Sequence, residues 1–390
     1  YTSYTPYQPE ISQGRLESLL NFQTMVSDLT GLPLANASLL DEATAAAEAM
    51  VMARRASGSR SSSIFVHDDT HPQTIAVMST RAVPLGIELV VGSLDSLHDH
   101  EVFAALLSYP TSTGGIVDLS PAIARLHTEG AIAILATDPL ACVLLPSPGT
   151  IGADIAIGSA QRFGVPLGFG GPHAAYLAAT QAFARTLPGR LVGVSVDEHG
   201  RRALRLALQT REQHIRREKA TSNICTAQAL LANVAAMYAV WHGPDGLAKI
   251  ASRVHHVAST WAACVERAGW KLVHPMFFDT VAIHTRGRAV ELSSRLRSNG
   301  IDVRVIDDQV LSTTFDETST FELVERMCAA LDIESIEPSL VEMRVHPERC
   351  RQDSILTAEV FHRYRSEHEM LRYLRRLSDL DLALDRTMIP

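Results

Sequence analysis

Short apolar segments that alternate with helical segments constrain the fold of this chain more than any other feature. Strand-like runs such as SIFVH (63–67) and AIAILATD (131–138) are separated by helical segments such as HPQTIAVMSTRA (71–82). SPAIARLHTEG (120–130) is a further helix, which we expect Ser120 to cap. Strands buried on both faces have continuous apolar runs, so the alternation predicts an α/β fold with a large, mostly parallel sheet covered on both faces.

Glycine and proline positions divide the chain into further units. Residues 12–30 have helical leucine spacing and stop at Gly31, and residues 39–55 form an alanine-rich helix. The segment 221–243 reads as a buried helix that ends at Gly243, the first residue of the turn signal GPDG (243–246). We therefore predict an N-terminal arm and helix over 1–30, a large α/β domain over 31–244, a smaller α+β domain over 245–335, and a linker with the start of a further unit over 336–390.

Composition excludes several classes of protein. The net charge of −8 argues against a nucleic-acid-binding protein, and no apolar run is long enough for a membrane span. The five cysteines form no CxxC pair, which is typical of reduced thiols. The sixteen histidines have no ligand spacing, so no metal site is expected. With 46% hydrophobic and 20% charged residues, the composition is that of a soluble globular protein rather than a disordered one.

The segment SAQRFGVPLGFGGPH (159–173) has the form of a loop that carries an imine-forming lysine, yet it holds Gln161 and Arg162 instead. The chain has only three lysines, of which Lys219 follows Arg216 and Arg217 directly before the long helix. Lys219 is either an imine-forming lysine or part of a basic rim at a helix start, and its charged surroundings favour the rim.

Two further segments are candidates for a binding role. Thr221, Ser222 and Asn223 offer hydroxyls, an amide and backbone N–H groups at a helix start, which suits an anion or serves as a simple N-cap. Tyr4 and Tyr7 lie in an extended arm that either crosses a partner subunit or packs locally.

The chain closely resembles the P-protein family of the glycine cleavage system, the glycine decarboxylases. The resemblance is carried by long contiguous matches over residues 4–50, 158–176, 206–247 and 366–377. It implies the pyridoxal-phosphate-dependent transferase fold of the aspartate aminotransferase type (fold type I). In this family two homologous halves share that fold, and the second half carries the lysine that binds pyridoxal 5'-phosphate. The segment 159–173 resembles the lysine loop of the first half, with Gln161 or Arg162 at the equivalent position of the lost lysine.

The resemblance also implies a reaction. Glycine loses its carboxylate as CO2 at the pyridoxal phosphate, and the remaining aminomethyl group passes to the lipoyl arm of the H-protein. This chain would supply no catalytic residue, would not hold the cofactor covalently, and would be inactive alone. Residues that we expect to help shape the pocket in the lysine-bearing half are Tyr4, Tyr7, His173, Thr221, Ser222 and Asn223, and residues that we expect to dock the carrier protein are Arg216, Arg217 and Lys219.

The tail from about Ile355 resembles the opening of the second half, so we expect a piece of a longer enzyme that works as a homodimer. The expected partners are the lysine-bearing half, lipoylated H-protein and glycine. The family places the enzyme in the bacterial cytoplasm, or in the mitochondrial matrix of a eukaryote, and we favour the former. The alternatives are a non-catalytic structural or regulatory subunit of the same complex and a free-standing enzyme that uses Lys219.

Overall fold

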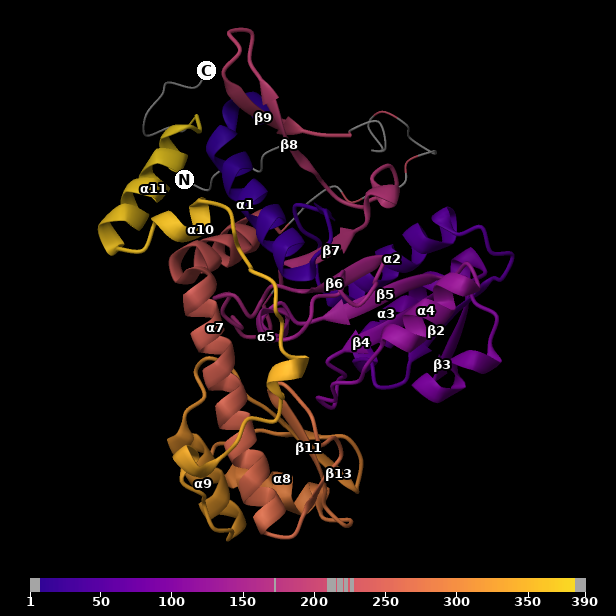
Figure 1. The fold of residues 1–390 in the computed structure, drawn as a ribbon, viewed down its shortest axis with the longest axis vertical. Coiled ribbons are helices and arrows are strands. Elements are labelled where there is room, and N and C mark those ends of the chain that lie inside the picture. Colours follow the sequence, from indigo (N-terminus) through magenta and orange to yellow (C-terminus); the bar gives the residue numbers. More distant parts are fainter. Residues whose placement is uncertain are drawn as a thin grey trace.

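A computed structural model describes residues 8–171, 173–208, 215, 220, 224 and 228–382. Its largest element is a seven-stranded sheet of order β1-β7-β6-β5-β4-β2-β3 (Figure 1). The run from β3 to β6 is parallel, whereas β7 pairs antiparallel with both β6 and β1. The predicted α/β class is confirmed, and the antiparallel edge is an addition to the predicted parallel sheet. The strands are β1 (Leu34–Ala35), β2 (Ser63–His67), β3 (Glu88–Gly92), β4 (Ala104–Tyr109), β5 (Ile132–Thr137), β6 (Ile155–Ser159) and β7 (Ala175–Ala179).

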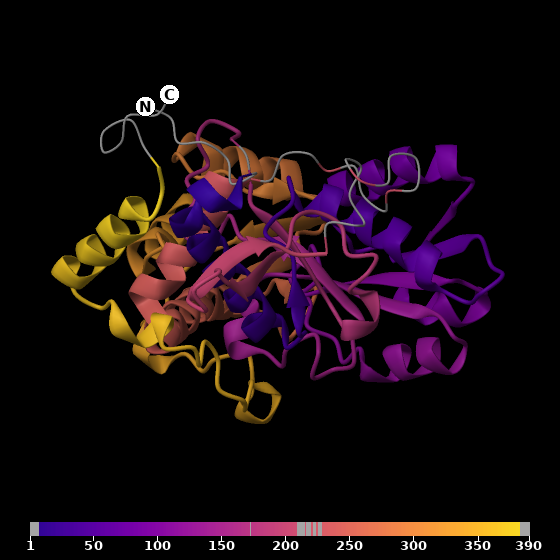
Figure 2. The ribbon, with the colours of Figure 1, turned by 90° about the horizontal axis from the view of Figure 1, so that it is seen from above.

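Helices cover both faces of this sheet, as Figure 2 shows from above. Successive side chains of each strand enter different cores: Ile134 packs among residues of α2 (Glu42–Ala56) and α3 (Pro72–Ala82), and Leu135 among residues of α1 (Gln13–Thr30) and α4 (Ser120–Thr128). Both side chains are fully buried. Burial of one such side chain stabilises the fold by about 1.5–3 kcal/mol, which explains why the central strands are continuous apolar runs.

The helix boundaries mostly follow the capping residues in the sequence. Gly31 ends α1 in the left-handed conformation (φ 67°), and the Asp41 carboxylate accepts a hydrogen bond from the Thr44 N–H at 2.8 Å to start α2. The prediction that Ser120 caps α4 is wrong. Ser120 is itself the first residue of α4, and its N–H donates to the carboxylate of Asp118 at 3.1 Å.

The long helix α7 (Ala229–Arg267) connects the two sheets of the molecule (Figure 1). The prediction that a helix ends at Gly243 agrees with the backbone, which leaves the helical conformation at this residue; a second helix follows directly, so α7 consists of two helices joined across a kink. Gly243 has a left-handed φ of 57° and is followed by Pro244, which cannot donate the next backbone hydrogen bond. The predicted start at residues 221–222 lies outside the described residues.

A four-stranded antiparallel sheet of order β10-β11-β13-β12 lies at the far end of α7. It carries α8 (Ala289–Ser298) and α9 (Phe321–Leu331), in keeping with the α+β pattern of the sequence, although the exact domain limits stay a prediction. Its strands are β10 (Lys271–Leu272), β11 (Thr280–His284), β12 (Arg304–Val305) and β13 (Val310–Thr314). The remaining elements are the ribbon of β8 (Val192–Val196) and β9 (Arg202–Leu206), the helix α5 (Ala141–Leu144), and the 3₁₀ turns η1 (Pro9–Ile11), η2 (Val83–Leu85), η3 (Leu94–Asp99), η4 (Gln181–Phe183), η7 (Pro338–Leu340) and η8 (Pro347–Arg349).

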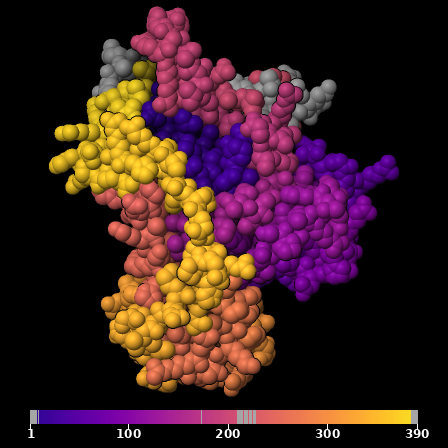
Figure 3. Space-filling view, in the orientation of Figure 1, coloured from indigo at the N-terminus to yellow at the C-terminus, as the bar shows by residue number. Residues whose placement is uncertain are grey.

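The segment 332–359, which we call the strap, runs from α9 back over the surface to α10 (Val360–Arg363) and α11 (Glu367–Asp379) (Figure 3). The buried side chain of Arg351 fastens it. This guanidinium donates hydrogen bonds of 2.7–2.8 Å to the carbonyls of Asp28 and Leu29 at the end of α1 and of Cys142 in α5. The strap is therefore attached to the same helices that cover the large sheet.

Candidate functional site

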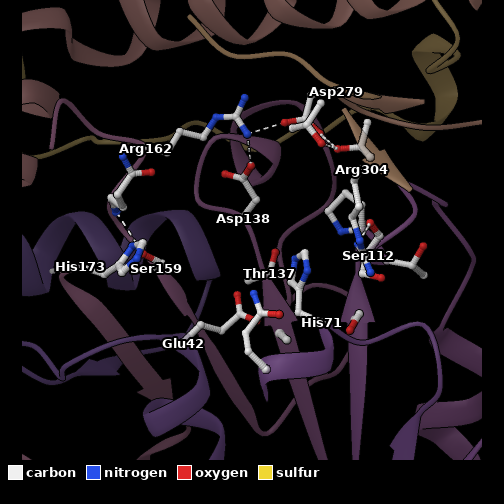
Figure 4. A pocket seen from close by; sticks show the side chains of 18 residues that line it. Glu42, His71, Ser112, Thr137, Asp138, Ser159, Arg162, His173, Asp279 and Arg304 are labelled. Carbon is white, nitrogen blue, oxygen red and sulfur yellow. Dashed lines mark hydrogen bonds and ion pairs between the residues drawn. The ribbon is translucent and has the colours of Figure 1, made fainter. Parts of the chain in front are cut away.

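A cavity of about 520 Å³ lies where the carboxyl ends of β2, β4, β5 and β6 meet the small sheet (Figure 4). Parallel α/β sheets bind their ligands at this edge, and the volume suits a small molecule. The first turn of α2 closes the cavity on one side, and residues of β11, β12 and β13 close it on the other. It is lined by Glu42, His71, Gln73, Ser108, Pro110, Thr111, Ser112, Ala136, Thr137, Asp138, Ser159, Gln161, Arg162, His173, Asp279, Thr280, Arg304 and Thr314.

Arg162 occupies the wall between the two sheets. Its Nη1 forms ion pairs with Asp138, at 2.6 Å, and with Asp279, while its Nη2 donates to the carbonyl of Phe315 at 2.9 Å. Its side chain is 14% exposed. Burial lowers the pKa of Arg162, but the two carboxylates outweigh burial and hold it well above its usual range, so the guanidinium stays charged. Arg162 thus joins the end of β5 to the start of β11 by charge-assisted hydrogen bonds.

Two other charged side chains face the cavity from opposite sides (Figure 4). Glu42, in the first turn of α2, accepts a hydrogen bond from the Thr74 hydroxyl at 3.1 Å. Burial raises the pKa of this carboxyl, and the nearby His71 opposes the rise. Arg304, on β12, donates from Nη1 to the carbonyl of Ser112 at 3.1 Å.

A second polar cluster holds the small sheet to the large one beside the cavity. The Asp69 carboxylate accepts hydrogen bonds from the hydroxyls of Ser112 and Thr113, and the Thr113 hydroxyl also contacts Nε2 of His274 at 2.8 Å. Burial would raise the pKa of Asp69, but the hydrogen bonds from His274 and these hydroxyls hold it well below its usual range. The cluster is therefore anchored by a carboxylate that stays ionised.

In the turn after β6, the two candidates for the position of the lost lysine, Gln161 and Arg162, make different contacts. The Gln161 amide donates to the carbonyl of Val165 at 2.7 Å, so it is tied to its own turn, whereas Arg162 reaches across to Asp279. Further along the turn Leu167 and Phe169 are exposed, and Phe169 has a left-handed φ of 60° between two glycines that also have positive φ. The turn thus presents two apolar side chains to solvent.

Of the residues that the sequence singles out, Gln161, Arg162 and His173 line the cavity, and His173 contacts the Ser159 hydroxyl at 3.2 Å through Nδ1. The others lie outside the described residues, namely Tyr4, Tyr7, Arg216, Arg217, Lys219, Thr221, Ser222 and Asn223.

The sequence analysis missed several cavity residues. Asp138 follows β5 directly, and a carboxylate at the carboxyl end of a predicted parallel strand is a signal that could have identified it. Asp279 and Arg304 come from the small sheet, and no local pattern in the sequence marks them as neighbours of Arg162.

Pyridoxal phosphate does not fit this cavity as its residues stand. No lysine is among its described lining residues, and Asp138 is engaged by Arg162. A helix N-terminus favours a phosphate group, but in α2 the Asp41 carboxylate already accepts the Thr44 N–H and Glu42 adds a second carboxylate. The described lining thus offers neither a lysine that could hold the cofactor covalently nor a suitable position for its phosphate group.

Two classes of site find no support within the described ranges. No three side chains of the metal-ligating types gather there into a group that could hold an ion. Nor does any helix built from these residues have the length and apolar character needed to cross a bilayer.

The fold resembles that of several solved enzymes. A crystal structure of glycine decarboxylase (P-protein) of the glycine cleavage system, in inhibitor-bound form, matches 85% of this chain and 78% of that chain with a TM-score of 0.80 and 37% identity. The cysteine desulfurase CsdA from Escherichia coli matches 85% of this chain and 86% of that chain with a TM-score of 0.59 and 15% identity. An alanine–glyoxylate aminotransferase from Nostoc gives a TM-score of 0.57 over 81% of this chain and 86% of that chain at 13% identity. The predicted fold type I is confirmed.

Sequence comparison gives the family. The glycine dehydrogenases (decarboxylating) of Rhodopseudomonas palustris and Gluconobacter oxydans are 55% and 57% identical over 100% of this chain. The chain spans only 41% and 42% of the length of these two relatives. The family model of the glycine cleavage system P-protein matches residues 1–331. The chain therefore belongs to the glycine cleavage system P-protein family.

Proposed function

We propose that this chain is the half of a P-protein that completes the active site without holding the cofactor. The complete enzyme would decarboxylate glycine and transfer the aminomethyl group to the lipoyl arm of the H-protein. Pyridoxal phosphate would be bound by the lysine-bearing half and would supply the electron sink for decarboxylation. The chain's relatives are named glycine dehydrogenase (decarboxylating), and the chain covers about two fifths of their length.

The observation that best supports this proposal is that the Arg162 guanidinium is held by ion pairs with two carboxylates. A guanidinium cannot form an imine, and this one is paired with Asp138 and Asp279 in the cavity wall. We propose that Arg162, rather than Gln161, stands at the position of the lost lysine, because Arg162 reaches Asp138 while Gln161 is turned back to Val165.

The contribution of this chain would come from its surface turns. The turn after β6 exposes Leu167 and Phe169 at its tip, which suits insertion into an apolar part of a second half. The arm with Tyr4 and Tyr7 and the helix start with Asn223, both outside the described residues, are proposed for the same role. Docking of the carrier protein through Arg216, Arg217 and Lys219 is proposed as well, as is the homodimer of complete chains.

Reconstitution tests the proposed function. Release of labelled CO2 from carboxyl-labelled glycine is measured for this chain, for the lysine-bearing half, and for their mixture, each with pyridoxal phosphate. We expect no release and no borohydride-trapped imine on this chain alone, and full release from the mixture. Stable labelling of Lys219 would contradict the proposal. A lysine-bearing half that is as fast alone as in the mixture would favour the non-catalytic structural or regulatory subunit.

Variants of the turn test its role separately. Leu167→Ser and Phe169→Ser should each lower the reconstituted rate about tenfold, because a buried apolar anchor at an interface contributes about 1–3 kcal/mol. Leu340→Ser is the matched control, since Leu340 on the strap is as exposed as Leu167 (78% and 73%). Equal effects of the Leu167 and Leu340 substitutions on the rate would contradict the proposed role of the turn in the active site.

A further inference from the structure

The cavity contains two oppositely charged side chains, Glu42 and Arg304, that form no ion pair within the described chain, although the imidazole of His71 lies near Glu42. Glu42 makes a single hydrogen bond, from the Thr74 hydroxyl, and Arg304 makes a single hydrogen bond, to the carbonyl of Ser112. Neither side chain forms an ion pair with any described residue. A guanidinium has five N–H donors and a carboxylate accepts about four hydrogen bonds, so both groups keep most of their capacity.

The other charged groups of the cavity are already engaged with one another. Arg162 lies between Asp138 and Asp279, and Asp138 also accepts the Leu140 N–H at 2.7 Å. A ligand that enters the cavity therefore meets Glu42 on the side of the large sheet and Arg304 on the side of the small sheet (Figure 4).

The overall charge decides which ligands the cavity accepts. Among the described residues, its lining holds the carboxylates of Glu42, Asp138 and Asp279, the guanidiniums of Arg162 and Arg304, and two imidazoles. A multiply charged anion, such as a phosphate ester, would be placed against an excess of carboxylates. A purely cationic ligand would leave Arg304 without a counter-charge. Only a molecule that carries one positive and one negative group satisfies both unpaired side chains.

We propose that this cavity binds a small zwitterion of the amino-acid class, with its ammonium group against Glu42 and its carboxylate against Arg304. Such a ligand would bridge the two sheets at the place where Arg162 and Asp279 already join them. The site would be separate from the cofactor site of the lysine-bearing half, and it requires no lysine and no pyridoxal phosphate. It is therefore independent of the proposed function.

Calorimetric titration of the chain in the absence of cofactor tests this site. The probes are glycine, β-alanine and 4-aminobutyrate, which carry the same two charges at increasing separation, and acetate and methylamine, which carry one charge each. We expect at least one of the three zwitterions to bind with a Kd at least tenfold below those of acetate and methylamine. Inorganic phosphate should not compete with it.

Charge-removing variants assign the two ends of the ligand. Glu42→Gln and Arg304→Met should each raise the Kd of the best zwitterion at least tenfold, because each removes a charge-assisted contact. Two matched controls lie outside the cavity. Glu88→Gln changes a carboxylate that likewise accepts one hydroxyl hydrogen bond, from Ser63, and Arg326→Met changes a guanidinium that likewise donates to one carbonyl, that of Asn299. Neither control should change the Kd.

Three results would overturn the inference. The first is that no zwitterion binds below about 10 mM, a free energy too small for two charged contacts. The second is that acetate or methylamine binds as tightly as the best zwitterion. The third is that the Glu42 or Arg304 variant binds like its control. Each can occur whether or not the mixture of halves releases CO2, so failure of this inference and failure of the proposed function are distinguishable.

Discussion

Replacement of Arg162 by methionine should destabilise the chain strongly, because it leaves two carboxylates facing each other without their cation. The side chains involved are 14% exposed for Arg162, 25% for Asp138 and 9% for Asp279. Removal of one partner from a buried ion pair costs about 3–5 kcal/mol, and the partial exposure of Asp138 places the expected loss of unfolding free energy at about 3–4 kcal/mol. The exposed pair of Arg125 and Glu129 provides the control, and Arg125→Met should cost below about 1 kcal/mol.

The loss should depend on pH in a defined direction. Burial already raises the pKa of Asp138 in the folded chain, and removal of Arg162, which opposes this rise, should raise the pKa further. A group with a raised folded pKa costs stability as the pH increases, so the loss should be larger at pH 7.5 than at pH 5.

Urea unfolding followed by tryptophan fluorescence and by circular dichroism measures this loss. Arg162→Met combined with Asp279→Asn should recover a large part of it, because one of the two carboxylates is then neutral. A loss below about 1 kcal/mol at pH 7.5, or equal losses at both pH values, would refute the assignment of Arg162 as the neutralising cation.

Three further changes test other parts of the structure. Glu42→Gln should make the chain more stable than the parent at neutral pH and equally stable near pH 4. Burial raises the pKa of Glu42, so its ionisation at higher pH lowers the free energy of unfolding of the parent. Thermal melts across this pH range measure the difference, and a difference that does not change with pH would contradict the prediction. Arg351→Met should lower the free energy of unfolding, measured in urea, by about 2–4 kcal/mol, because carbonyls of α1 and α5 lose their hydrogen-bond donor. Arg349→Met, which removes only an exposed ion pair with Asp118, should have little effect. Equal losses for the two variants would show that Arg351 does not anchor the strap. Gly243→Ala should lower the melting temperature more than Gly269→Ala. Both glycines have positive φ, but only at Gly243 would the new methyl group meet the Arg365 guanidinium. Equal melting temperatures of the two variants would exclude that clash.

The large sheet was predictable because its evidence is local. Runs such as 132–137 are apolar throughout, and caps such as Asp41 and Gly31 lie next to the residues whose backbone groups they satisfy. The break at Gly243 was predictable because glycine followed by proline is typical of a helix end. The contacts at the kink were not predictable, because they come from residues far along the chain: α10 packs against α7, and Arg365 donates to the carbonyl of His242.

The cavity was only partly predictable. The turn at 159–173 was identified because its residue order is distinctive, whereas the partners of Arg162 are 24 and 117 residues away in the chain. The pair with Asp138 depends on β5 and β6 being neighbours in the large sheet, and the pair with Asp279 depends on the docking of the small sheet, and a single sequence encodes neither in a short pattern. The balance of charges that defines the cavity therefore became visible only in three dimensions.

The strap has a mechanical consequence for the small sheet. The chain enters the unit of the small sheet through α7 and leaves it through the strap, and Arg351 fixes the strap to α1 and α5. The small sheet is also joined to the large sheet by the ion pair of Arg162 with Asp279 and by the contacts of Thr113 with Asp69 and His274. A unit that is attached at several separated points has no single free axis of rotation. The strap therefore adds to the contacts that fix the distance between β5 and β11, and with it the width of the cavity between the two sheets.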